Sequence, residues 1–436
     1  MNAKTRALLR EIYDAAVAAA HPATCLPPTL PPPPAHGRLL VLAAGKAAGS
    51  MAEVAERHYT ETLRMPRERI SGIAVARHGY GRPLRTIEMV EAGHPIPDAA
   101  GIKVAERALA LADGTEAGDL VLVLLSGGAS ANWIAPANGI SLDDKRALTR
   151  ALLASGATIG EINTVRKHLS RIKGGRLAAR AAPARVITLA ISDVPGDDPS
   201  VIGSGPTVPD ASTLAEARAI LAARGVEPPA SIAAALADPA NESPKPADPA
   251  FSNSEFHIVA RPADAVAAAA DAVRAAGYDP VLLGTDLEGE ARNVAAAHAG
   301  EAMKIAAAGR RAALLSGGEL TVTIRGQGRG GPNQEYALAL AIALKGHKGV
   351  TAVVGDTDGT DGGGGSPDDP AGAFVDETTL ARALALGLDP ARFLAENDST
   401  GFFERLGDLL APGPTCTNVN DLRAVLVDTR GNAGEK

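Results

Sequence analysis

Continuous apolar runs alternate with amphipathic stretches along the first half of the chain. An apolar run without polar alternation is typical of a strand that is covered on both faces of its sheet. We predict such strands at residues 38–44, 70–77, 86–92, 119–125 and 185–192. Apolar residues at helical spacing follow several of them, as at 98–113 and 141–155. This alternation predicts βαβ units, a mostly parallel sheet and therefore an α/β fold.

A stretch rich in Pro, Ser and Asn, residues 237–254, interrupts the pattern and is typical of a linker between domains. The chain has 436 residues, more than one hydrophobic core usually organises. We therefore predict two domains, residues 1–240 and 241–436. In the second domain the pattern predicts helices at 262–277, 290–309 and 333–344, strands at 257–260, 279–284 and 349–355, and two strands joined at Ser-Gly-Gly within 312–326.

Composition narrows the class of protein. The chain is 46% hydrophobic but only 3% aromatic, so its cores must be aliphatic. The net charge of −7, with both signs interspersed, argues against a nucleic-acid surface. Cys25 and Cys416 lie too far apart in sequence to suggest a disulfide framework. The amphipathic start is unlike a signal peptide, and no apolar run of about 18 residues predicts a membrane span. We expect a cytoplasmic protein without nucleic-acid or membrane partners; the sequence leaves the oligomeric state open, a homodimer included.

Two glycine-containing turns follow predicted strands and are candidate anion sites. Lys46 stands after Gly45 at the start of a helix, where backbone N–H groups attract phosphate and a lysine adds charge. A second turn follows the strand at 119–125, and its candidate residues are Ser126, Gly127, Gly128 and Ser130. The structural alternatives are a surface lysine in the first case and a tight turn with positive φ in the second.

Residues 164–178 carry five Arg or Lys side chains and one His. Arg166, Lys173 and Arg176 are candidates for a common anion-binding cavity. A solvated basic face is the alternative interpretation.

Residues 191–207 combine acids, glycines and hydroxyls directly after a predicted strand. Asp193, Asp197 and Asp198 are candidate Mg²⁺ ligands, or one of them accepts a proton from an attacking hydroxyl. Further along, the candidate phosphate contacts are Ser204, Gly205 and Thr207. A second acidic loop, 355–372, follows another predicted strand, and its candidate metal or hydroxyl contacts are Asp356, Asp358 and Asp361.

One motif favours a different chemistry. Gly326, Gly328 and Gly331 fit GxGxxG, after a predicted strand and before the helix at 333–344. That context is typical of a dinucleotide site and would support an NAD(P)-dependent reductase. The several other anion-type turns of the chain argue against a reductase, since a dinucleotide site needs only one such turn.

Eight ordered segments together carry a family resemblance: AAGKAAGSM, GHPIPD, LLSGGAS, NTVRKHLSRIKGGRLA, SDVPGDDPSVIGSGPT, LLSGGELTVTIRGQGRGGPNQE, GDTDGTDG and GPTCTNVNDL. From about residue 5 to 425, the chain resembles the glycerate 2-kinases of the MOFRL type, some of which carry the name hydroxypyruvate reductase. The resemblance implies ATP-dependent phosphorylation of D-glycerate to 2-phospho-D-glycerate with Mg²⁺. It also implies a Rossmann-like N-terminal domain, a smaller C-terminal α/β domain and an active site in the cleft between them.

The family's functional residues carry over to matching positions. Lys46 matches the lysine after the first strand, Asp193 the aspartate of the SDV-GDD motif, Glu319 the acid of SGGE and Asn418 the asparagine of TNVND. One position departs, because Pro332 stands where the family pattern has an arginine. Arg325 or Arg329 is then a candidate to supply that charge.

The expected mechanism places the ATP phosphates along Ser126–Ser130 and Ser204–Thr207. Lys46 neutralises charge on the transferring phosphate or on the glycerate carboxylate, and Asp193 acts as base or as Mg²⁺ ligand. Asp198 and Asp358 are the other predicted metal ligands. Two other hypotheses stay open, an NAD(P)H-dependent hydroxypyruvate reductase and a non-catalytic ligand sensor on the same fold.

Overall fold

The computed structural model describes residues 1–362, 366 and 368–428. The chain forms two compact units. Residues 25–259 make up one of them. Residues 1–24 and the chain from Ala260 onward make up the other, so the first unit is an insertion into the second.

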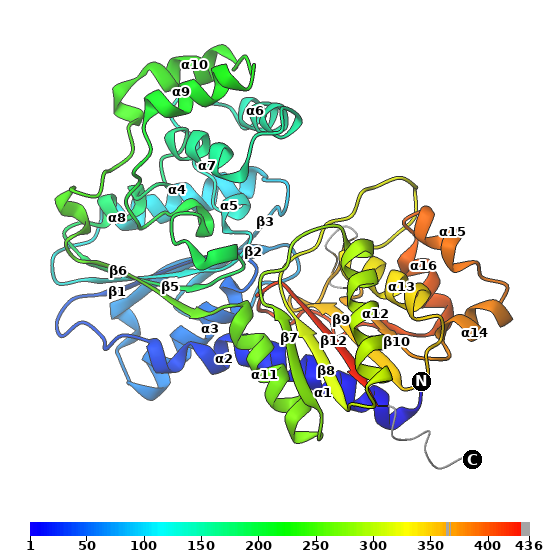
Figure 1. Cartoon of the computed structure of the whole chain (residues 1–436). Helices are drawn as coiled ribbons and strands as arrows, with labels where there is room; N and C mark the ends of the chain where they lie inside the picture. The colour runs from blue at the N-terminus through cyan, green and yellow to red at the C-terminus, as the bar shows by residue number, and fades with distance from the viewer. Residues whose placement is uncertain (363–365, 367, 429–436) are drawn as a thin grey trace, which may run out of the picture. The chain divides into compact units, whose positions relative to one another are not determined.

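The unit of residues 25–259 is built on a six-stranded sheet of order β3-β2-β1-β4-β5-β6 (Figure 1). Its strands are β1 (Leu39–Ala44), β2 (Ile70–Arg77), β3 (Glu88–Ala92), β4 (Leu120–Leu125), β5 (Arg185–Ile191) and β6 (Ser254–Ala260). The neighbouring pairs from β3 to β5 are all parallel, and Leu39 of β1 lies between Ile70 of β2 and Leu120 of β4. Every residue of β1 and β4 is buried, as their apolar runs predict. The expected Rossmann-like sheet is thereby confirmed.

Helices cover both faces of this sheet. Helix α3 (Ala48–Arg57) packs against β1, β2 and β4. On the opposite face lie α4 (Ala99–Asp113) and α8 (Arg176–Ala181), with the short α5 (Ala129–Asn132) after β4 (Figure 1). The buried residues of the core between sheet and helices are aliphatic apart from Trp133, and the partly buried Phe251 and Phe256 pack against them.

A group of helices in the same unit has a core of its own. It consists of α6 (Leu142–Ala154), α7 (Ile159–His168), α9 (Leu214–Ala223) and α10 (Ala230–Ala237) (Figure 1). Side-chain oxygens of Ser141, Thr158 and Thr213 cap the first three, and the last two of these caps are complete capping boxes.

The other unit contains a mixed sheet of order β11-β10-β9-β12-β8-β7. Its strands are β7 (Asp279–Gly284), β8 (Ala312–Ser316), β9 (Val350–Asp356), β10 (Gly372–Val375), β11 (Leu409–Leu410) and β12 (Asp421–Val427). Strand β12 lies between β8 and β9 and runs antiparallel to both. Within the described residues, β7 and β8 form the one parallel pair of this sheet.

Helices α12 (Ala291–Ala307) and α13 (Pro332–Leu344) pack on one face of the mixed sheet. Helices α1 (Ala3–Ala20) and α11 (Pro262–Ala275) pack together against its other side. The Tyr13 hydroxyl donates to the carbonyl oxygen of Asp356 at 2.7 Å, which ties α1 to the end of β9. The remaining helices are α2 (Pro22–Cys25), α14 (Thr379–Ala385), α15 (Pro390–Ala395) and α16 (Ser399–Leu406).

Two features differ from the sequence analysis. The boundary expected at residue 240 lies at 259/260, because β6 joins the first sheet; in addition, α1 belongs to the C-terminal unit. The second strand predicted within 312–326 is wrong: after β8 only Thr321 makes a single bridge, to Glu290. Both sides of β8 are already occupied, by β7 and β12, so the segment cannot pair with β8 as a hairpin. In the described part of the chain, no helix is both long and apolar enough to cross a membrane.

Candidate functional site

The carboxyl ends of β1 and β4 lie side by side in the first sheet. The strand order places β2 and β3 beyond β1, and β5 and β6 beyond β4. In sheets of this kind the connections diverge between the two central strands and leave a crevice where ligands bind. Lys46 follows β1 and Ser126 follows β4 at this point. The two predicted anion turns are therefore neighbours.

Hydrogen bonds join the two turns directly. The Lys46 N–H donates to the carbonyl oxygen of Gly127 at 2.8 Å, and the Ala47 N–H donates to Ser126 Oγ at 2.9 Å. The fully buried Ser126 thus accepts from the protein itself. Helix α3 begins at Ala48, so Lys46 stands at its positive end.

Gly128 brings a third group to the same place. Its φ is +85°, and a Cβ there would lie 2.9 Å from the His94 ring and 3.4 Å from Cγ of Lys46. Lys46 and His94 therefore flank Gly128, and no side chain fits between them. Sequence reasoning missed His94. The clue in the sequence is the position of His94, which follows the strand that ends at Ala92 in the same parallel sheet.

The predicted contacts at 204–207 lie against α5 and β5. The hydroxyls of Ser130 and Ser204 share a hydrogen bond of 2.7 Å. The hydroxyl of Thr207 shares one of 2.7 Å with Thr188 of β5. The carbonyl oxygen of Gly205 accepts from a backbone N–H at 2.7 Å. The structure therefore brings Ser130 and Ser204 together, whereas Thr207 is bonded into the interior.

The acids after β5 belong to the same edge of the sheet. Asp193 is half-buried two residues beyond the end of β5, which is the neighbour of β4. Asp198 is exposed, and its Oδ1 accepts from the N–H of Ser200 at 2.8 Å. Among the described residues, no group of three or more His, Cys, Asp or Glu side chains could hold a metal ion. Mg²⁺ commonly uses only one or two carboxylates together with phosphate and water, so Asp193 fits such a role.

A cavity of about 330 Å³ beside Ser130 is lined by basic side chains. Two of them, Arg166 and Lys173, are sequence candidates. Arg176 does not line this cavity, since its guanidinium donates to the carbonyl oxygen of Asn241 at 2.6 Å. The other basic side chains all come from α6, and sequence reasoning missed them: Lys145, Arg146 and Arg150. Lys145 carried a signal, because it falls on the apolar stripe of its helix with Leu148 and Leu152.

Two lysines of this cavity are buried. Lys173 donates to the carbonyl oxygens of Ser130 at 3.2 Å and of Gly203 at 3.4 Å. Burial, with Lys145 and Arg166 nearby, holds the pKa of Lys173 well below its ordinary value. Burial and the charge of Arg166 lower the pKa of Lys145 from 10.5 to about 8.

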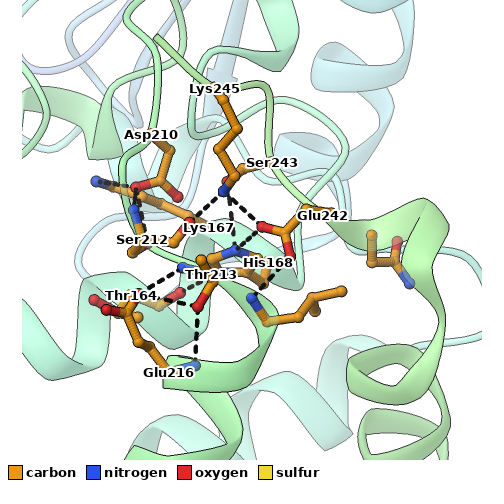
Figure 2. A network of polar contacts seen from close by, with 12 residues as sticks. Thr164, Lys167, His168, Asp210, Ser212, Thr213, Glu216, Glu242, Ser243 and Lys245 are labelled. Carbon is orange, nitrogen blue, oxygen red and sulfur yellow. Dashed lines mark hydrogen bonds and ion pairs between the residues drawn. The ribbon is translucent and has the colours of Figure 1, made fainter. Parts of the chain in front are cut away.

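Two other residues of the basic segment serve the fold. Figure 2 shows Lys167 and His168 of α7 in a polar network with the loops before α9 and after α10. Lys167 pairs with Asp210 at 3.4 Å, and the His168 ring bonds to Glu242 at 3.2 Å. Burial opposes the charge of Glu242, yet hydrogen bonds from Lys245, Leu214 N–H and His168 lower its pKa to about 2. The network holds α7, and with it Arg166, in place.

In the C-terminal unit, the SGGE, GDTDG and TNVND loops meet at one end of the strands of the mixed sheet. Strands β8 and β9 end there, and the antiparallel β12 begins there with Asp421 opposite Asp356. The buried Arg423 donates to the carbonyl oxygens of Gly317 at 2.9 Å and Gly318 at 3.2 Å and pairs with Asp421. Arg423 therefore joins the SGGE loop to the TNVND loop.

A buried carboxylate holds the start of α13. Asp361 accepts from the backbone N–H groups of Asn333 at 3.0 Å and Gln334 at 2.8 Å. Burial nevertheless raises the pKa of Asp361 to about 7, and Asp421 nearby adds to the rise. The Asn333 side chain donates to Asp421 at 2.6 Å, so it links the two carboxyl groups.

The other predicted site residues of this unit do not form one cluster with these loops. Glu319 and Arg325 are exposed. Asn418 is buried, and its Oδ1 accepts from the N–H of Asn420 at 3.4 Å. Asp358 is buried and accepts from both the N–H and the hydroxyl of Thr360, at 2.8 and 3.0 Å.

The GxGxxG segment lacks the structure of a dinucleotide loop. No strand leads into it, and β12 separates the strands on either side of its helix. A Cβ at Gly326 or Gly328 would clash with residues 396–398, and one at Gly331 would clash with Asp361. The glycines thus permit close packing of the protein's own chain. Pro332 is the first residue of α13, a position where a missing N–H costs nothing.

Comparisons with known proteins agree along most of the chain. Residues 8–237 match a model described as Domain of unknown function (DUF4147), and residues 312–421 match the MOFRL family. A protein of Agrobacterium vitis named "Putative hydroxypyruvate reductase" is 47% identical, over 98% of this chain and 95% of that protein. D-glycerate 2-kinase of Thermotoga maritima is 42% identical, over 88% of this chain and 89% of that protein.

A crystal structure of glycerate kinase from Thermotoga maritima matches the fold with a TM-score of 0.86 at 40% identity, covering 98% of this chain and all of that one. The MOFRL model, the Thermotoga maritima relative and the solved structure lead to the same assignment, and the chain belongs to the glycerate 2-kinase family of the MOFRL type.

Proposed function

We propose that this chain transfers a phosphoryl group from ATP to the 2-hydroxyl of D-glycerate, with Mg²⁺ as the metal ion. The observation that carries the proposal is the meeting of Lys46 with the Ser126–Gly128 turn at the carboxyl ends of β1 and β4. The relatives named glycerate kinase support the choice of substrate.

The chemistry asks mainly for position and for charge neutralisation. Lys46 supplies a positive charge at the N-terminal end of α3, where the helix dipole adds to it. The left-handed Gly128 lets the backbone come close to a bound anion, with His94 on its other side. This part of the crevice is therefore suited to the phosphoryl group or to the carboxylate of the acceptor.

Asp193 is the proposed base or metal ligand. It follows β5 at the same sheet edge as Lys46, and it is half-buried. A bound Mg²⁺ would add positive charge against the phosphate oxygens. Asp193 would hold the ion or take the proton of the 2-hydroxyl. Glu319, Arg325, Asn418, Asp198 and Asp358 stay predicted contacts of substrate or metal.

A reductase is the competing function, because two relatives carry that name. Its sequence support was the GxGxxG motif, and the packing of Gly326, Gly328 and Gly331 gives those glycines a structural reason. We therefore favour the kinase.

One pair of assays tests the choice. The full chain is incubated with D-glycerate, ATP and Mg²⁺ while ADP and the position of the phosphate are followed. In parallel, hydroxypyruvate is supplied with NADH or NADPH and the oxidation of the cofactor is followed. We expect 2-phosphoglycerate in the first assay. Cofactor oxidation without ADP release would replace the kinase by the reductase.

A further inference from the structure

The cavity beside α5 is lined by several positive charges and, in the part of the chain that the structure describes, by no carboxylate. Five basic side chains line it: Lys145, Arg146, Arg150, Arg166 and Lys173. Within the described residues, no Asp or Glu is part of the lining. Like charges at short range repel, so this arrangement costs free energy in the empty protein.

Lys145 shows the imbalance most clearly. Its side chain lines the cavity, yet the residue is only 8% exposed. Its ammonium nitrogen is buried without a hydrogen-bond partner, and no ion pair of Lys145 occurs among the residues that the structure describes. A buried ammonium without a partner is strongly unfavourable, and nothing in the fold benefits from it.

The charged groups around Lys145 confirm that nothing nearby compensates it. Arg166 faces it from α7 and Lys173 from the loop that follows, and both are cations. The acids on its own helix have other partners. Asp143 pairs with Arg146 at 3.4 Å, and Asp144 accepts from the hydroxyl of Ser231 at 2.8 Å.

Apart from Ser130 and Thr149, the rest of the lining is apolar. Ile96, Ile134 and Leu142 contribute to it. A volume of about 330 Å³ lies within the range of about 300–1,000 Å³ that is typical of sites for drug-sized ligands. The cavity therefore offers an apolar wall beside a cluster of cations, which suits a molecule with both an aromatic ring and a multiply charged anion.

We propose that this cavity binds a ligand through its phosphate or carboxylate oxygens, and that Lys145 is the cation that determines its affinity. The identity of the ligand rests on the proposed function. In a glycerate kinase, such oxygens come from the polyphosphate of ATP or from the carboxylate of glycerate. Size and apolar wall favour the nucleotide.

Binding to the full chain tests the proposal without turnover. Calorimetry would measure the affinities for inorganic tripolyphosphate, for ATP and for D-glycerate. The chain is compared with Lys145→Met and with Lys103→Met, a matched control because Lys103 is an exposed lysine on α4. We expect Lys145→Met to weaken tripolyphosphate and ATP at least about tenfold, since a charge-assisted hydrogen bond is lost. Lys103→Met should change neither affinity by more than about twofold.

The outcomes separate the two ligand sources and the two proposals. If Lys145→Met weakens the binding of glycerate but not that of tripolyphosphate or ATP, the cavity binds the carboxylate of glycerate. Affinities within twofold for all three ligands in Lys145→Met would overturn the inference. If the chain fails to phosphorylate glycerate but binds tripolyphosphate through Lys145, the proposed function fails and the site stands.

A proton measurement distinguishes direct contact from a structural role. An anion beside Lys145 raises the pKa of its ammonium, which is about 8 in the empty cavity. Binding at pH 8.5 should then take up protons, seen as a dependence of the binding heat on the ionisation enthalpy of the buffer. This uptake should disappear in Lys145→Met. Equal uptake by the variant would contradict the contact.

Discussion

Replacement of Lys145 by methionine should make the protein more stable. The pKa of Lys145 is lowered from 10.5 to about 8 by burial and by Arg166. At about 1.4 kcal/mol per pKa unit, the folded state carries a charge penalty of about 3 kcal/mol. Methionine has a similar length and no charge, so it should recover most of that free energy of unfolding at little packing cost.

The pH dependence gives the reasoning a second test. Because the folded pKa is lower than the unfolded one, both states hold the proton below pH 8 and the penalty is fully present there. Between pH 8 and 10.5 the unfolded chain binds more protons, so the stability contributed by this group rises with pH. The advantage of Lys145→Met should therefore be largest at pH 7 and smaller at pH 9.5.

Urea denaturation followed by fluorescence can measure the effect. The chain has one tryptophan, Trp133, and it is buried in the same unit as Lys145. We expect a higher urea midpoint for Lys145→Met at pH 7, and a change within about 0.5 kcal/mol for the exposed control Lys103→Met. A Lys145→Met variant that is no more stable at pH 7, or whose advantage is the same at pH 9.5, would refute the argument.

Four further outcomes are expected. Lys46→Ala should lower kcat for glycerate phosphorylation by at least about a hundredfold with an unchanged unfolding midpoint, and a near-normal rate would remove Lys46 from the mechanism. Asp193→Asn should abolish transfer in the same assay, and full activity would exclude it as base or metal ligand. Gly128→Ala should cost about 1–3 kcal/mol and reduce turnover, because φ is +85° and His94 lies 2.9 Å from the new Cβ; an unchanged rate and melting curve would contradict this. Burial raises the pKa of Asp361 to about 7, so the folded protein loses stability as the pH rises from 4 to 7. Asp361→Asn has no proton to lose, so its melting temperature should rise progressively above that of the wild-type chain over this range. A constant difference between the two melting temperatures would count against this reasoning.

Much of the first unit could be predicted from its sequence. The apolar runs at 38–44 and 119–125 became buried parallel strands, because their hydrophobic length alone specifies strands covered on both faces. Motif position then placed Lys46 and Ser126 at one sheet edge, but the strand order that makes them neighbours is a property of the whole fold. The sequence shows His94 after a strand and Lys145 on the apolar stripe of its helix, but their roles come from tertiary packing.

The second unit shows where local pattern is insufficient. The segment TVTI at 321–324 has good strand residues, yet both sides of β8 are already paired. GxGxxG looked like a ligand loop, whereas its glycines meet residues 396–398 and Asp361, which lie far along the chain. In both cases the local structure depends on a contact with residues distant in sequence, and a short segment of sequence does not contain that information.

The placement of α1 has a consequence for biosynthesis. Its apolar face, including Leu9, Ile12 and Tyr13, is made before the sheet on which it packs, since the strands of that sheet begin after Ala260. Tyr13 must wait for Asp356, a partner 343 residues later. Residues 25–259 can complete their own core during synthesis, whereas the unit formed by the flanking segments needs β12, at Asp421–Val427, to complete its sheet. Folding of this chain should therefore proceed from the middle outward, and the apolar face of α1 should stay uncovered until the strands of its sheet have been made.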